Sequence, residues 1–211
     1  MKFFPYKTRN LKGALLYVPK DSKGPFPLVI WLNGGQDGAQ MPLLYSLGKL
    51  LKDESIQQPN CAVLMPVADY GRNYMTMTED QLLELVTMAR GEANLDHRNI
   101  SLCGWGEGAD AAAILATKLS GMFCRICLIS SYPKALEKKL VGIPLLLLIG
   151  GKEKSANRDW LDILERMPTA SLLIAENYGH EIGDRIWAEE GGWLIRWLTA
   201  DGGGACYRTS R

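Results

Sequence analysis

The stretch Ile100-Ser101-Leu102-Cys103-Gly104-Trp105-Gly106-Glu107-Gly108 joins two segments of different character. Residues 100–104 form a short apolar run that is typical of a buried strand. Residues 109–119 form an alanine-rich run that favours a helix. Glycine at every second position of the junction indicates a tight turn, so the sequence predicts a strand, a turn and a helix in direct succession.

Strand and helix patterns alternate along the rest of the chain. Apolar, strand-like runs occupy residues 13–18, 28–33, 61–65, 100–104, 123–130, 144–149 and 171–175. Helical spacing is found over residues 42–52, 78–89, 109–119, 159–166 and 186–198. This alternation predicts an α/β fold, a mainly parallel sheet with helices on both faces in a three-layer αβα sandwich. Sites in such sheets lie beyond the carboxyl ends of the strands.

Length and charge restrict the class of protein. The 211 residues suit one domain, which we expect over residues 1–200, followed by a flexible tail over 201–211. A net charge of +1 gives no electrostatic reason to expect a nucleic-acid or membrane partner. The N-terminus has no apolar signal segment, and the longest apolar run, 143–149, is too short to span a bilayer. We therefore expect a cytoplasmic protein.

The cysteines and histidines argue against a metal site. Five cysteines without a signal segment indicate reduced thiols. Cys124 and Cys127 match Cys-x-x-Cys, but in a strand two positions three apart face opposite sides of the sheet. We expect them to be small buried apolar groups. With only His97 and His180 in the chain, a histidine-rich metal site is excluded, and we expect neither metal nor cofactor.

The glycine turn matches a known motif except at its centre. In the nucleophile elbow, Gly-x-Ser-x-Gly, a serine stands on the turn between a strand and a helix. Here Gly106 stands in the place of that serine. The chain resembles α/β-hydrolases, in particular small lid-less esterases or dienelactone-hydrolase-like enzymes, over about residues 28–198. The resemblance implies an α/β-hydrolase fold and, in an active member, cleavage of a small-molecule acyl substrate: an ester, a thioester or an amide.

The resemblance also assigns a histidine and an acid. His180 follows the last predicted strand in a Gly-His pair, as the catalytic histidine of the family does. Glu153 follows strand 144–149, where the family usually has Gly-x-x-Asp, and Asp159 is the alternative acid. His97 precedes the strand of the elbow. It is therefore expected in a solvated loop at the other end of the sheet.

Two loops are expected beside these residues. The loop 33–38 follows a buried strand, and Asn33 replaces the histidine that often begins the oxyanion loop of the family. The resemblance assigns the oxyanion hole to the backbone N–H groups of Gly35 and Glu107.

The loop 68–74 follows the strand at 61–65. Its Arg72 is a candidate to bind an acidic group, and Tyr70 or Tyr74 to line an aromatic pocket. The alternative is a solvated loop with Arg72 in a surface ion pair.

Gly106 decides the function. A glycine keeps the shape of the turn and relieves its strain, but it excludes covalent acyl transfer through this residue. Its origin is either a laboratory replacement of serine or natural loss. Three functions fit the sequence: a serine acyl hydrolase that has lost its nucleophile, a non-catalytic pseudo-hydrolase that binds a ligand or a partner, and a slow hydrolase in which His180 activates water directly.

Overall fold

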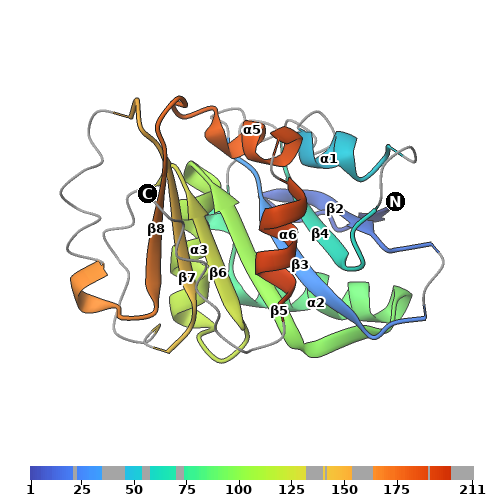
Figure 1. Cartoon of the computed structure of the whole chain (residues 1–211). Coiled ribbons are helices and arrows are strands. Elements are labelled where there is room, and N and C mark those ends of the chain that lie inside the picture. Colours follow the sequence, from blue (N-terminus) through green and yellow to red (C-terminus); the bar gives the residue numbers. More distant parts are fainter. Residues whose placement is uncertain are drawn as a thin grey trace.

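The described part of the chain forms one eight-stranded mixed sheet with helices on both faces (Figure 1). The computed structural model describes residues 1–20, 23–34, 46–53, 58–69, 74–131, 140, 142–153, 164–189 and 191–200. The strands are β1 (Lys2–Pro5), β2 (Leu11–Tyr17), β3 (Phe26–Leu32), β4 (Ala62–Ala68), β5 (Leu95–Trp105), β6 (Arg125–Ile129), β7 (Leu145–Gly150) and β8 (Ala170–Ala175). The helices are α1 (Ser46–Leu50), η2 (Tyr74–Thr76, a 3₁₀ turn), α2 (Glu79–Glu92), α3 (Glu107–Lys118), α5 (Ile182–Glu189) and α6 (Gly191–Thr199).

Six strands of the sheet run parallel. The order across the sheet is β1-β2-β4-β3-β5-β6-β7-β8, and every neighbouring pair from β4 to β8 is parallel, whereas β1 and β2 are antiparallel additions at one edge. Every residue of β4, β6 and β7 is buried, because helices cover both faces of the sheet. This explains the continuous apolar runs of the sequence and confirms the predicted parallel α/β sheet.

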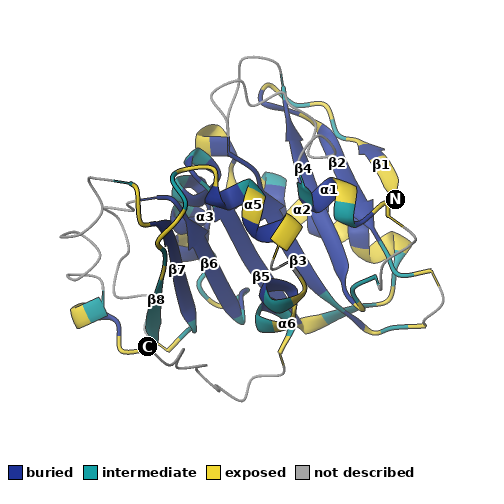
Figure 2. Cartoon of the chain, turned by 45° about the horizontal axis from the view of Figure 1, so that its top comes forward, coloured by how far each residue is buried: buried dark blue, intermediate teal, exposed yellow. Residues whose placement is uncertain are grey.

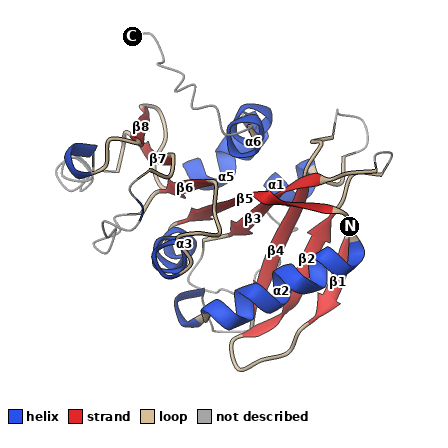
Figure 3. Cartoon of the chain, turned by 90° about the horizontal axis from the view of Figure 1, so that it is seen from below, coloured by secondary structure: helices blue, strands red, loops and turns tan. Residues whose placement is uncertain are grey.

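Two apolar cores lie on opposite faces of the sheet. Helices α2 and α3 pack on one face, and α1, α5 and α6 pack on the other (Figure 3). In the second core, Trp187 of α5 meets Trp31 of β3 edge to face, with ring centroids 5.1 Å apart. Strand β8 at the sheet edge is only partly buried, whereas β4, β6 and β7 are buried throughout (Figure 2).

The structure corrects several predicted elements. Strand β5 begins at Leu95, so His97 is an exposed strand residue and not a loop residue, although it does lie at the end of β5 away from Gly106. The single C-terminal helix predicted over 186–198 is two helices, α5 and α6. Strand β1, with three of its four residues exposed, was not predicted from the sequence.

Other predicted helices agree where they are described. The capping box at the start of α2 is confirmed, because Thr78 Oγ1 accepts the N–H of Gln81 at 3.3 Å and Gln81 Oε1 accepts the N–H of Thr78 at 2.9 Å. Only residues 164–166 of the helix predicted over 159–166 are described, and they are helical.

The structure confirms the predicted burial of Cys127 but not that of Cys124, which is half-buried. Cys124 lies one residue before β6, so strand alternation does not apply to it, and its Sγ lies 3.3 Å from both Ser101 Oγ and Asn99 Oδ1. Cys127 is buried beside its register partner Cys103. The described residues contain no cluster of metal-ligating side chains and no helix long and apolar enough to cross a membrane.

Burial of Cys61 predicts a stability change at high pH. Desolvation raises the pKa of this buried thiol from 9.0 to about 12. In the unfolded chain the thiol ionises first, so its contribution to stability is complete below about pH 9 and is lost as the pH rises towards about 12. Urea unfolding at a series of pH values should show a shallower decline in the free energy of unfolding for Cys61→Ala than for the parent in this window. Parallel curves would contradict this assignment.

Candidate active site

The turn between β5 and α3 holds Gly106 in a conformation that favours glycine. Its φ is +54° and its ψ is −124°, a region that side chains rarely adopt. The N–H of Gly106 donates to the carbonyl of Ile129 at 2.8 Å, and its carbonyl accepts the N–H groups of Ala109 and Asp110 at 2.9 and 3.1 Å. These bonds fix residue 106 at the carboxyl end of β5, on the N-terminus of α3.

A side chain at residue 106 would meet His180. A Cβ built on Gly106 lies 3.0 Å from Nε2 and 3.2 Å from Cε1 of His180. His180 follows β8, and its side chain is 60% exposed. The imidazole therefore lies against the position that a serine side chain would occupy, and a hydroxyl there would lie within reach of Nε2.

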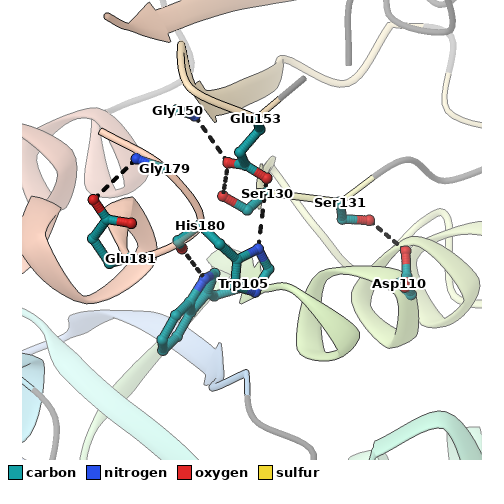
Figure 4. Close-up of polar contacts among 9 residues, drawn as sticks. All are labelled: Trp105, Asp110, Ser130, Ser131, Gly150, Glu153, Gly179, His180 and Glu181. Carbon is teal, nitrogen blue, oxygen red and sulfur yellow. Dashed lines mark hydrogen bonds and ion pairs between the residues drawn. The ribbon is translucent and has the colours of Figure 1, made fainter. Parts of the chain in front are cut away.

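Glu153 lies on the other side of the imidazole. Its Oε2 is 3.5 Å from Nδ1 of His180, which is an ion-pair distance and longer than a hydrogen bond (Figure 4). Its Oε1 accepts hydrogen bonds from Ser130 Oγ at 2.6 Å and from the N–H of Gly150 at 3.0 Å. With only 10% of the side chain exposed, these two donors orient the carboxylate.

The loops after β7 and β8 are joined by backbone hydrogen bonds. The N–H of Gly151 donates to the carbonyl of Ala175 at 2.8 Å, and the N–H of Lys152 donates to the carbonyl of Tyr178 at 2.9 Å. The loop that carries Glu153 is thereby fixed against the loop that carries His180. Beyond it, the Glu181 carboxylate accepts the N–H of Gly179 at 3.0 Å, and backbone hydrogen bonds to this carboxylate lower its pKa.

Ser130 is a site residue that was not predicted from the sequence. This buried residue follows β6 and has a φ of +50°, which is unusual for a residue with a side chain. Its hydroxyl donates to Glu153, and the adjacent Ser131 hydroxyl donates to Asp110 of α3 (Figure 4). The available signal was two consecutive serines at the carboxyl end of a parallel strand, which is the edge where such sheets carry their sites.

The end of β3 is held by a buried polar pair. Asn33 is 2% exposed, and its Oδ1 lies 2.5 Å from the hydroxyl of Tyr74. That hydroxyl also lies 2.9 Å from the carbonyl of Pro66. Tyr74 is itself buried, so it does not line an open aromatic pocket as the sequence had suggested. The pair fixes the backbone at the first residue of the predicted oxyanion loop.

The structure brings three of the predicted site residues together: Gly106, Glu153 and His180, from the carboxyl ends of β5, β7 and β8. Glu107 is the first residue of α3, so its N–H has no acceptor within the helix. Gly35, Tyr70, Arg72 and Asp159 lie outside the described residues. A histidine between a carboxylate and the turn at Gly106 is arranged to accept a proton at Nε2.

The fold matches those of known hydrolases, although no protein-family model and no curated protein sequence matches the chain. A thermostable esterase superposes with a TM-score of 0.68 at 17% identity, over 93% of this chain and 62% of the esterase. The Staphylococcus aureus fluorophosphonate-binding serine hydrolase FphF gives 0.68 at 13%, over 95% and 98%. Est1E from Butyrivibrio proteoclasticus gives 0.64 at 12%, over 93% and 96%.

The chain thus spans less than two thirds of the thermostable esterase but nearly the whole of the other two. Together with the eight-stranded, mostly parallel sheet, these likenesses establish the α/β-hydrolase fold that the sequence predicted.

The turn at Gly106 predicts a graded loss of stability. Gly106→Ala and Gly106→Ser should each lower the free energy of unfolding by about 1–3 kcal/mol, because a side chain at positive φ is strained. The new Cβ must also displace His180 by a few tenths of an ångström. Gly106→Val should cost more, since its Cβ carries two further carbons. Urea unfolding measures all three variants, and equal stability of all three with the parent would exclude the strained turn.

The positive φ of Ser130 predicts that a glycine at this position is more stable than an alanine. Ser130→Ala and Ser130→Gly both remove the hydrogen bond to Glu153, but only glycine relieves the positive φ. Ser130→Gly should therefore be more stable than Ser130→Ala by about 1 kcal/mol. Thermal unfolding of the two variants side by side tests this, and a more stable alanine variant would show that residue 130 is unstrained.

Proposed function

We propose that this chain is a serine acyl hydrolase by descent, with Gly106 at the nucleophile position, His180 as the base and Glu153 as the acid. One observation carries the proposal: the Cβ position of residue 106 lies 3.0 Å from Nε2 of His180, whose Nδ1 faces a buried, hydrogen-bonded carboxylate. The substrate class is a small ester, thioester or amide. The likeness in fold to esterases supports this class without identifying a substrate.

Each residue has a distinct role in the proposed ancestral enzyme, which carries serine at residue 106. A serine at residue 106 attacks the carbonyl carbon, and His180 takes its proton at Nε2 and later gives it to the leaving group. Glu153 holds the proton of His180 on Nδ1 and stabilises the imidazolium. The N–H groups of Gly35 and Glu107 stabilise the oxyanion. Tyr70 and Arg72 are the proposed contacts to the substrate.

With glycine at residue 106, the protein lacks this nucleophile. Cys103 is buried three residues earlier in β5, and burial raises the pKa of its thiol well above the ordinary value, so it stays protonated. Direct attack by water on a substrate beside His180 is the only hydrolytic route left to these residues. A hydrolase that has lost one member of its triad retains about 10³–10⁴-fold acceleration over the uncatalysed reaction in water.

A second function rests on the same geometry. Gly106 relieves the strain of the turn, while Glu153 and His180 keep their positions without a nucleophile. A protein that binds an acyl ligand or a partner without cleaving it requires only this arrangement.

Restoring the serine tests the proposal. The parent should not react with a fluorophosphonate probe and should hydrolyse p-nitrophenyl acetate at no more than a trace rate. Gly106→Ser should gain both activities, because His180 and the carboxylate of Glu153 are already beside residue 106. Adding His180→Ala should reduce the gained rate by about 10⁴–10⁶-fold, since the serine loses its base.

His97→Ala in the Gly106→Ser background is the matched control. His97 is exposed at the opposite end of β5, so its removal should leave both readouts unchanged. Folding of each variant is checked by circular dichroism. A folded Gly106→Ser protein that stays inert towards the probe and a range of acyl esters would contradict the hydrolase descent and favour the binding protein. Full activity of the parent would overturn the assignment of the nucleophile.

A further inference from the structure

Trp105 makes a direct link between the turn at residue 106 and the loop of His180. It is the last residue of β5 and precedes Gly106 in the chain. Its indole Nε1–H donates to the backbone carbonyl of His180 at 2.8 Å, and the two rings lie 5.6 Å apart at 36° (Figure 4). A residue covalently adjacent to the proposed nucleophile position therefore holds the backbone of the proposed base.

Two glycines enclose Trp105. A Cβ on Gly183 in α5 would lie 2.1 Å from Cδ1 and Cγ of the indole, so the ring packs against the bare backbone of the helix. A Cβ on Gly34 at the end of β3 would lie 2.8 Å from the carbonyl oxygen of Trp105 and 3.1 Å from Cδ2. One residue thereby contacts three segments: the end of β3, the loop of His180 and the first turn of α5.

The side chain of His180 is otherwise loosely held. It is 60% exposed, and its ion pair with Glu153 is 3.5 Å long. A backbone hydrogen bond from the N–H of Ile182 to the carbonyl of Gly179, 3.2 Å long, closes a short turn around His180. The location of the imidazole relative to residue 106 therefore depends on where the backbone of His180 is anchored.

We propose that Trp105 is a positioning residue that sets the distance between His180 and residue 106, through its indole hydrogen bond and its packing on Gly183. This inference rests on the proposed function for its consequence in catalysis. Its structural part, the anchoring of His180, holds for the chain as it is. A shift of about 1 Å in a catalytic group can cost about 10²-fold in rate, which sets the scale of the expected effect.

Trp105→Phe removes the indole N–H and keeps an aromatic ring. In the Gly106→Ser background it should lower kcat about 10–100-fold with little change in KM, because it misplaces the base and leaves substrate contacts intact. Gly183→Ala should act in the same direction by pushing the indole aside. Trp197→Phe is the matched control. This half-buried tryptophan of α6 lies over Arg125 at the start of β6, and its replacement should leave kcat unchanged.

A second readout does not depend on activity. The chain has only two histidines, so their ring Cε1–H signals are readily assigned by NMR. In the parent with Gly106, Trp105→Phe should move the His180 signal and leave that of His97 in place, whereas Trp197→Phe should move neither. The indole ring also shifts this signal through its ring current, so the crystal structure of Trp105→Phe must in addition show a longer distance between Nε2 of His180 and the Cα of Gly106. If Gly106→Ser is inert but this distance increases, the anchoring stands and the hydrolase descent fails. An unmoved His180 signal, or an unchanged kcat in an active Gly106→Ser background, would overturn the proposal.

Discussion

The close approach of α3 to the ends of β3 and β5 is the constraint on which the site depends. A Cβ on Gly108 would lie 2.2 Å from the carbonyl oxygen of Leu32, and a Cβ on Gly104 would lie 2.4 Å from that of Gly108. Neither position has room for a side chain, so the helix starts directly on the strand ends. The chain between them turns through the positive φ of Gly106, which directs residue 106 towards His180.

The rest of the site is held by bonds that do not involve a side chain at residue 106. Ser130 and Gly150 orient the carboxylate of Glu153, and Trp105 holds the carbonyl of His180. Backbone bonds between the loops after β7 and β8 complete the arrangement. Loss of a serine hydroxyl would remove none of these contacts. A preorganised histidine and carboxylate are therefore compatible with glycine at residue 106.

The sequence predicted those parts of the fold that depend on burial and connection order. The central strands are buried on both faces and read as apolar runs, and parallel strands bring their carboxyl ends to one edge. That rule, together with the resemblance to α/β-hydrolases, placed Glu153 and His180 beside Gly106. Exposed strand residues carry no such signal, which is why β1 and the extension of β5 through His97 were missed.

Contacts set by tertiary packing were not readable from the sequence. The hydrogen bond from Ser130 to Glu153 joins residues 23 positions apart, and the hydrogen bond from Trp105 to His180 joins residues 75 positions apart. Strand or helix periodicity contains no information on such pairs. Asn33 illustrates the same limit, since the sequence marked it as a departure in the oxyanion loop and the structure gives it a buried partner, Tyr74.

The most direct test of the central claim is the crystal structure of Gly106→Ser, with the distance between the serine Oγ and Nε2 of His180 as the measured quantity. The account predicts a serine at positive φ whose Oγ lies within about 2.6–3.2 Å of Nε2, with Glu153 still facing Nδ1. A serine that relaxes to negative φ, or an imidazole that moves out of reach of Oγ, would contradict the claim that residue 106 is a nucleophile position.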